Sequence, residues 1–189
     1  MIAEIPPRVA AASAHAAAAG FPMSSEAAVG ELLRVFAAAV PPGGRILEIG
    51  TGTGFGTAWL VDGLGLRRDV DVVTIDIDAE RVAAVAARDW PSYVTFEVGD
   101  GLDVLARSGT FDLVFADAPP GKTSGLDRTI AALRPGGVLV VDDMAIFPDG
   151  DPEWVDKLAA VRTTLFETPG LVAVELAHGS GVIVATRRT

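Results

Sequence analysis

Cysteine is absent from the 189 residues of this chain. Its absence excludes disulfide bonds, thiolate zinc sites and cysteine nucleophiles, and it suits a reducing compartment. We therefore expect a cytoplasmic protein. Histidine is almost absent as well, and neither His15 nor His178 lies in a recognisable motif. We predict that neither histidine is catalytic.

Basic residues are scarce: 15 lysines and arginines stand against 25 aspartates and glutamates, a net charge of −10. The averaged field repels phosphate backbones and anionic lipid, and no local basic cluster offsets it. Long apolar runs are missing too, because Ser13 and His15 interrupt the alanine-rich run at residues 10–19. The first residues also lack the pattern of a signal peptide. We expect no nucleic-acid partner and no membrane association.

Short β-branched runs alternate with helical stretches from residue 45 onward, a pattern typical of βαβ units with a parallel sheet. Strands are predicted at residues 45–49, 70–75, 94–98, 111–116 and 138–141, and helices at residues 57–64, 79–89, 102–106, 125–133 and 152–167. Asp78 and Ser124 are candidate N-caps for two of these helices. The chain is long enough for one buried core and too short for two.

The two ends of the chain depart from this alternation. A helix is predicted at residues 9–19, and a second one, capped by Ser24 or Ser25, should run to residue 40. Residues 171–176 and 182–186 predict an antiparallel hairpin whose turn, with His178, lies near the outer edge of the sheet. We predict one domain over residues 1–189, with a helical cap (residues 1–42) on a doubly wound α/β core (residues 43–189).

A glycine-rich turn follows the first predicted strand, in segment 46–56 (ILEIGTGTGFG). Ligands of doubly wound folds bind at this position, and glycine lets the backbone approach them closely. The dinucleotide fingerprint G-x-G-x-x-G fits neither register, because it would need glycine in place of Phe55 or Thr57. The turn instead matches the pattern E-x-G-x-G-x-G.

This pattern resembles motif I of the class I S-adenosylmethionine-dependent methyltransferases, which implies a mostly parallel sheet of seven strands with the last one antiparallel. Two further strand ends extend the resemblance: Asp76 stands where the family grips ribose, and Asp100 stands in a G-D-G segment resembling the one that meets adenine. The resemblance predicts a set of cofactor-binding residues: Glu48, Gly50, Thr51, Gly52, Gly54, Asp76, Ile77, Asp100, Gly101 and Asp117.

Carboxylates also end the fourth and fifth predicted strands, at Asp117, Asp142 and Asp143. O-methyltransferases of the catechol and caffeoyl-CoA type hold magnesium with an acid and an Asp-Asn pair at these places, and segment 20–24 also resembles that subfamily beside its cofactor site. The resemblance implies that these three residues bind a cation, although Asp143 replaces the asparagine. Bare carboxylates 4 Å apart would repel by about 4 kcal/mol per pair, and oxygen ligands favour Mg²⁺, Mn²⁺ or Ca²⁺.

Asp117 and Lys122 are the predicted catalytic residues. Lys122 follows a Pro-Pro-Gly insertion that the subfamily lacks, and it could serve as general base or be an ordinary solvated lysine. Met144, Phe147 and Trp154 could form the walls of an aromatic acceptor site. The resemblance thus implies O-methylation of a small acceptor, for which a catechol-like diol would be the best chelator. We also expect a homodimer.

Two other functions fit parts of the sequence. Segment 116–123 (ADAPPGKT) satisfies a relaxed Walker A pattern, and Asp142 then resembles Walker B, as in an NTPase. Against this, Pro119 and Pro120 remove two backbone N–H groups from the phosphate cradle, and Asp117 adds negative charge to it. The other alternative is a non-catalytic sensor that binds S-adenosylmethionine.

Overall fold

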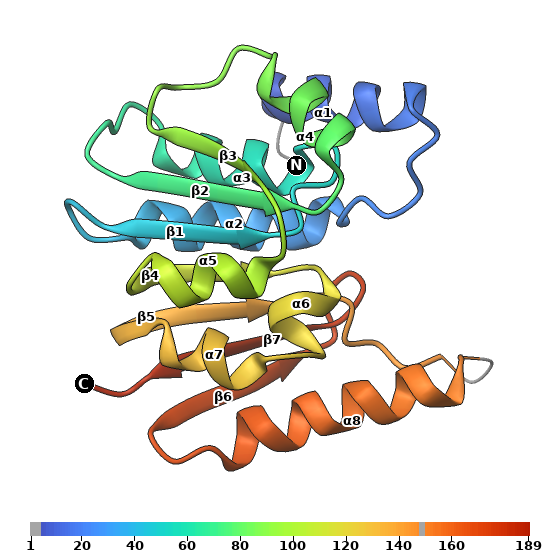
Figure 1. Ribbon diagram of the computed structural model, residues 1–189, viewed down its shortest axis with the longest axis vertical. Coiled ribbons are helices and arrows are strands. Elements are labelled where there is room, and N and C mark those ends of the chain that lie inside the picture. The colour runs from blue at the N-terminus through green and yellow to red at the C-terminus, as the bar shows by residue number, and fades with distance from the viewer. Residues whose placement is uncertain (1–4, 148–149) are drawn as a thin grey trace.

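The computed structural model describes residues 5–147 and 150–189. Its strands are β1 (Arg45–Ile49), β2 (Asp71–Asp76), β3 (Val94–Val98), β4 (Phe111–Ala116), β5 (Leu133–Val141), β6 (Leu171–Leu176) and β7 (Val182–Arg187). They form one sheet in the order β3-β2-β1-β4-β5-β7-β6 (Figure 1). Neighbours are parallel from β3 to β5, and β7 is antiparallel to both β5 and β6. The predicted doubly wound fold with an antiparallel C-terminal hairpin is confirmed.

The central strands are buried on both faces, as parallel strands between two helical layers require. Leu47, Val114 and Leu139 are fully buried on β1, β4 and β5. By contrast, β6 alternates between half-buried and exposed residues, because Leu171 and Ala173 pack against a core cluster while Val172 and Val174 on the other face are exposed. β5 begins at Leu133, five residues before the predicted start, and its register against β4 shifts between Phe111 and Leu113.

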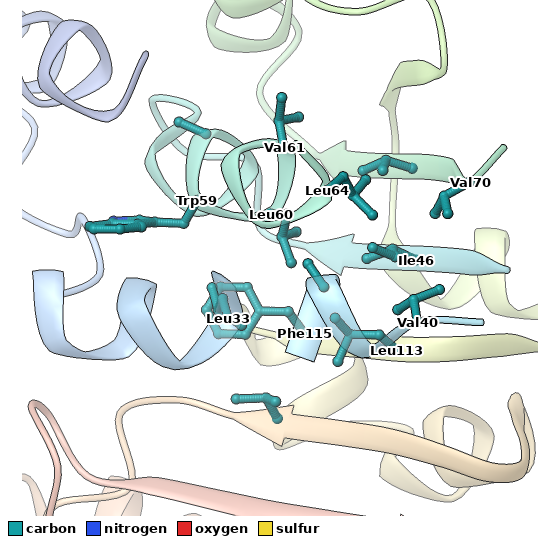
Figure 2. Packing of buried hydrophobic residues seen from close by; sticks show 14 of the residues in the cluster. Leu33, Val40, Ile46, Trp59, Leu60, Val61, Leu64, Val70, Leu113 and Phe115 are labelled. Carbon is teal, nitrogen blue, oxygen red and sulfur yellow. The ribbon is translucent and has the colours of Figure 1, made fainter. Parts of the chain in front are cut away.

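The helices are α1 (Pro7–Ala18), α2 (Ala27–Ala39), α3 (Phe55–Leu64), α4 (Ala79–Ala86), α5 (Gly101–Arg107), α6 (Pro119–Lys122), α7 (Leu126–Ala131) and α8 (Pro152–Glu167). One apolar cluster joins α1, α2 and α3 to one face of the sheet, and Figure 2 shows Leu33 and Leu60 near Phe115 of β4. A second cluster joins α5, α7 and α8 to the other face. The division into a cap (residues 1–42) and a core (residues 43–189) stays a prediction.

The helix starts agree only in part with the predicted caps. The Asp78 carboxylate accepts a hydrogen bond from the Arg81 N–H at 3.0 Å, so this cap is confirmed. The other two cap predictions are wrong, because α2 begins after Glu26 and α7 after Gly125, neither of which makes a side-chain capping bond. The hydroxyl groups of Ser25 and Ser124 instead donate to partners outside these helices.

A membrane-spanning helix requires both sufficient length and apolar character. The longest helix, α8, has 16 residues. Within the described residues, none of the helices combines the length and the apolar character that crossing a membrane requires.

Candidate functional site

The glycine-rich turn between β1 and α3 uses backbone conformations that favour glycine. Gly50, Gly52 and Gly54 have φ angles of 109°, 52° and 80°, a region that side chains with a Cβ rarely adopt. The N–H groups of Gly50 and Thr51 both donate to the Ile75 carbonyl, at 2.9 and 3.1 Å. The turn is therefore tied to the end of β2 by its own backbone.

Glu48 lies behind this turn and is fully buried. Its Oε2 accepts hydrogen bonds from the hydroxyls of Thr57 and Thr74, whereas Oε1 has no hydrogen-bond partner in the described part of the chain. Burial raises the pKa of Glu48 from 4.5 to about 7, against the opposing effect of the two hydroxyls. Gly56, which lies against Glu48 Oε1, lines the cavity in front of the turn and Glu48 does not, so Glu48 supports this region from behind.

A cavity of about 280 Å³ opens in front of the turn, at the carboxyl ends of β1, β2 and β4. The predicted cofactor residues that line it are Gly50, Thr51, Gly52, Asp76, Ile77, Gly101 and Asp117. Glu48, Gly54 and Asp100 are outside this lining. The Asp100 carboxylate accepts a hydrogen bond from the Leu102 N–H at 2.8 Å and so caps α5 at the cavity margin.

Asp76 links the turn to the start of α4. Its Oδ2 accepts from the Gly52 N–H at 2.9 Å, and its Oδ1 accepts from the Asp78 N–H at 3.1 Å. The Arg81 guanidinium lies 3.6 Å from the same Oδ1 and 4.7 Å from the centroid of the Phe21 ring. Phe21 also lies against Gly52, so the segment before α2 closes one side of the cavity.

Three carboxylates meet beside this cavity, as predicted. Oxygen atoms of Asp117, Asp142 and Asp143 lie within 4.8 Å of one another; we call these residues the carboxylate trio. Asp117 accepts from the Ser25 hydroxyl at 2.8 Å. Asp142 is 0% exposed, and its Oδ1 accepts from the Ser180 hydroxyl at 2.6 Å, whereas its Oδ2 has no hydrogen-bond partner among residues 5–147 and 150–189.

The electrostatics of the carboxylate trio favour a bound cation. Burial, followed by the charge of Asp142, raises the pKa of Asp117 well above its ordinary value, and Lys122 only partly opposes this. Burial likewise raises the pKa of Asp142, against the hydrogen bond from Ser180. A divalent ion would keep both groups ionised. The clustered carboxylate oxygens and the unpaired Oδ2 of Asp142 therefore fit an oxygen-liganded divalent cation.

Lys122 is buried beside the carboxylate trio, with 2% of its side chain exposed. The interpretation of Lys122 as a solvated loop lysine is wrong. Its Nζ donates to the Asp142 carbonyl at 3.1 Å, lies 3.6 Å from Asp143 Oδ2, and lies 5.7 Å from the centroid of the Trp154 ring. The lysine thus supplies one positive charge to a cluster of three acids.

A second cavity, of about 260 Å³, opens on the other side of the carboxylate trio. Its polar members are Asp143 and Ser180, and its other members are Ala145, Ile146, Phe147, Gly150, Trp154, Val155 and Leu158. Phe147 and Trp154 line it as predicted, but Met144 is fully buried in the core and does not. Asp117 lines the first cavity and Asp143 the second, so the trio stands between the two.

The segment that resembled Walker A does not form a phosphate cradle. Residues Pro119–Lys122, labelled α6, form an irregular turn, because Pro120 (ψ 128°) and Gly121 (φ 83°) do not have helical dihedral angles. The N–H of Gly121 donates to the Ser124 carbonyl, and those of Thr123 and Ser124 donate to the Pro119 carbonyl. These amides are used inside the turn, and the Lys122 ammonium faces acids, so the geometry does not favour an NTPase.

The two serines that contact the carboxylate trio, Ser25 and Ser180, were missed by the sequence analysis. They lie 92 and 38 residues away from the acids that they contact, so no local pattern marks them. His178 lies in the turn of the hairpin at the sheet edge, as predicted, and its Nε2 lies 2.8 Å from the Ala28 carbonyl of α2. The turn between β6 and β7 is therefore part of the site's surroundings.

Comparison with known proteins gives the family. A model described as a methyltransferase domain matches residues 47–144. A Mycobacterium tuberculosis protein named as a probable O-methyltransferase is 35% identical over 173 residues, which cover 85% of this chain and 76% of that protein. Both matches include the glycine turn and the ends of β4 and β5.

Solved structures share the same fold. O-methyltransferase TomG from Streptomyces achromogenes, in complex with SAM, has a TM-score of 0.84 at 24% identity, covering 100% of this chain and 93% of that one. Cofactor-bound Rv0187 from MTB has a TM-score of 0.82 at 28% identity, with the same coverage. The chain therefore belongs to the methyltransferase domain family, and the O-methyltransferase class expected from its sequence is confirmed.

Proposed function

We propose that the first cavity binds S-adenosylmethionine, that the second binds a small, flat and mostly apolar acceptor, and that a divalent cation held by the carboxylate trio assists methyl transfer between them. One observation carries this proposal: Asp117 lines the first cavity, Asp143 lines the second, and their carboxylate oxygens lie within 4.8 Å. Methyl donor and acceptor would thus meet at the trio.

The first cavity offers suitable partners to each part of the cofactor. Asp76 would accept hydrogen bonds from the ribose hydroxyls, as acids at this strand end do in nucleotide-binding folds. Gly50 and Gly52 let the backbone approach the cofactor. Gly101 lines the cavity and would contact the adenine edge, while Asp100 would hold the start of α5 in place as its cap. Asp117 would face the sulfonium charge. Glu48 would act from behind, by fixing the turn.

The carboxylate trio would hold Mg²⁺, Mn²⁺ or Ca²⁺, all of which prefer oxygen ligands. A bound cation would lower the pKa of an acceptor hydroxyl and orient it. Asp142 would contribute its unpaired Oδ2, and Asp117 the oxygen left free by Ser25. The aspartate at position 143 adds a negative charge that the asparagine of the subfamily lacks, and Lys122 compensates part of it at 3.6 Å.

The transfer itself would be an in-line displacement. The acceptor oxygen forms a bond to the methyl carbon while the carbon–sulfur bond breaks, and its electron pair stays on sulfur. The hydroxyl proton would leave to water before the transfer, because the cation would lower its pKa. Lys122, the predicted base, donates to the Asp142 carbonyl and lies 3.6 Å from Asp143 Oδ2, so it would not take this proton and would instead stabilise the acceptor oxyanion. The protein contributes mainly alignment and a site that excludes water.

The walls of the second cavity support an aromatic acceptor. Phe147 and Trp154 offer ring faces, and Asp143 and Ser180 provide the polar end. A planar ring with two adjacent hydroxyl groups would place both oxygens at the trio. A cytoplasmic location and a homodimer stay predictions.

The test is methyl transfer from labelled S-adenosylmethionine to a catechol and to the matching monophenol, with Mg²⁺ or with excess chelator. We expect methyl transfer to the catechol in the presence of Mg²⁺, and we expect excess chelator to abolish this transfer. Equal activity in chelator would contradict the role of the cation. Cofactor binding without transfer to any acceptor in a broad panel would favour the sensor.

A further inference from the structure

The two oxygens of the Asp142 carboxylate have very different surroundings. Oδ1 accepts two hydrogen bonds, from the Ser180 hydroxyl at 2.6 Å and from the Asp143 N–H at 2.7 Å. Oδ2 is buried and has no partner in the part of the chain that the structure describes. A carboxylate held in this way can present only Oδ2 to a ligand, because Oδ1 is already saturated.

The residue that holds Oδ1 is itself held firmly by the backbone. Ser180 lies in the turn between β6 and β7, and its carbonyl accepts from the Ala145 N–H at 2.8 Å. The carbonyl of Gly181 accepts from the Met144 N–H at 2.9 Å. Gly181 has a φ of 83°, and any Cβ there would press on the Ala145 backbone. The turn and the segment after β5 therefore fit together in one arrangement.

A second contact fixes the same turn to the opposite side of the site. His178 Nε2 lies 2.8 Å from the Ala28 carbonyl in the first turn of α2, and Gly179 packs against Val29. Just before α2, Ser25 donates to Asp117. The segments that carry the two serines are thus joined, and each serine donates to one acid of the carboxylate trio.

We infer that Ser180 is a positioning residue for Asp142: its hydroxyl occupies Oδ1 and so directs Oδ2 toward a cation at the carboxylate trio. This inference rests on the cation-assisted transfer proposed above. Without the hydroxyl, the carboxylate could rotate about its Cβ–Cγ bond and lose the orientation that the cation needs. Partners of this kind, which hold a metal ligand in place, typically change metal affinity by about 10- to 100-fold when they are removed.

The experiment titrates Mn²⁺ into the full-length protein saturated with S-adenosylhomocysteine and follows free Mn²⁺ by electron paramagnetic resonance. The variants are Ser180→Ala, which removes the donor, and Ser180→Thr, which keeps it. We expect about a tenfold weaker Mn²⁺ affinity for Ser180→Ala and an affinity within about threefold of wild type for Ser180→Thr. Thr168→Val is the matched control, because it removes a part-buried hydroxyl at the end of α8, and its affinity should not change.

Melting temperature and S-adenosylhomocysteine affinity, measured on the same samples, show whether each variant is folded. If Ser180→Ala does not fold, Ser180→Cys replaces it, with a weaker donor of similar size and an intermediate expected loss. If folded Ser180→Ala bound Mn²⁺ with wild-type affinity, the inference about Ser180 would be overturned, and the proposed function would not be affected. Absence of Mn²⁺ binding by the wild type would overturn the proposed cation, and the inference with it.

Discussion

The two halves of the site are built by different means. At the ends of β1 and β2, the cavity is shaped by backbone: Gly50, Gly52 and Gly54 have positive φ angles, and the Gly52 N–H donates to Asp76. At the ends of β4 and β5, it is shaped by buried charge, with Asp117 and Asp142 held by hydroxyls from distant segments. The turn of the first half is held by its own hydrogen bonds, whereas the second half has an excess of negative charge that a cation would balance.

Removing an acid from the second half should have the largest effect. For Asp142→Ala we expect turnover to fall on the order of 10³-fold, because a bound cation supplies several kcal/mol of charge stabilisation. S-adenosylhomocysteine affinity should stay within about threefold of wild type, since Asp142 does not line the first cavity. Single-turnover assays and calorimetry measure the two quantities. Asp103→Ala, at an exposed position on α5, is the control.

Asp142→Ala could instead lower S-adenosylhomocysteine affinity by as large a factor as it lowers turnover. Such a result would mean that the two halves are one electrostatic unit.

Glu48, which lies behind the glycine turn of the first half, is a buried acid with no cationic partner in the described part of the chain. Because its folded-state pKa of about 7 lies above the ordinary 4.5, the folded protein holds the proton more tightly than the unfolded chain. This contribution favours folding below pH 4.5 and is lost as the pH rises toward 7, by about 3 kcal/mol in total. Asp117 and Asp142 act in the same direction, since their pKa values are also raised.

Glu48→Gln should therefore flatten the fall in unfolding free energy between pH 5 and 7, and it should stabilise the protein at pH 8. Urea denaturation across this pH range measures both effects. Wild-type pH dependence in the variant would show that Glu48 does not titrate in this interval.

Asp76→Ala tests the first half more directly. Because the carboxylate accepts from the Gly52 N–H and faces the proposed ribose position, we expect the Kd for S-adenosylmethionine to rise about 10- to 100-fold, as for the loss of one or two charged hydrogen bonds. Mn²⁺ affinity should be unchanged. Unchanged cofactor affinity in calorimetry would remove Asp76 from the ribose role.

The smallest effect is expected at the closing segment. Phe21→Ala removes the ring that lies between Gly52 and the Arg81 guanidinium. Such a contact is worth about 0.5–1 kcal/mol at an exposed site, so the Kd for S-adenosylmethionine should rise about threefold. Phe21→Leu separates loss of apolar contact from loss of the ring. Equal affinities in all three proteins would show that this segment does not contribute to binding.

The first half could be predicted from sequence because its determinants are local. The glycines lie within five residues of one another, and Asp76 ends the next strand, so strand prediction alone brings them together. The trio could be predicted for the same reason, since parallel strands end at one edge of the sheet. Asp100 shows the limit of this approach, because its side chain caps α5 at the cavity margin.

The supports of the second half could not be predicted in this way. Ser25 and Ser180 reach their acids only after α2 and the C-terminal hairpin have packed, and a serine alone carries no signal of such a contact. Lys122 was predicted on chemistry, but its surroundings include Trp154, 32 residues further along, whose ring centroid lies 5.7 Å from Nζ. Packing between distant segments decided each of these positions.

The central claim is that the carboxylate trio joins a cofactor cavity to an acceptor cavity. The most direct measurement is a crystal structure with S-adenosylhomocysteine, Mn²⁺ and a catechol, in which anomalous scattering locates the metal. The account predicts Mn²⁺ bound by Asp117, Asp143 and Oδ2 of Asp142, with the catechol beside Trp154. Cofactor bound in the first cavity with Mn²⁺ absent from the trio, or the catechol bound elsewhere, would contradict it.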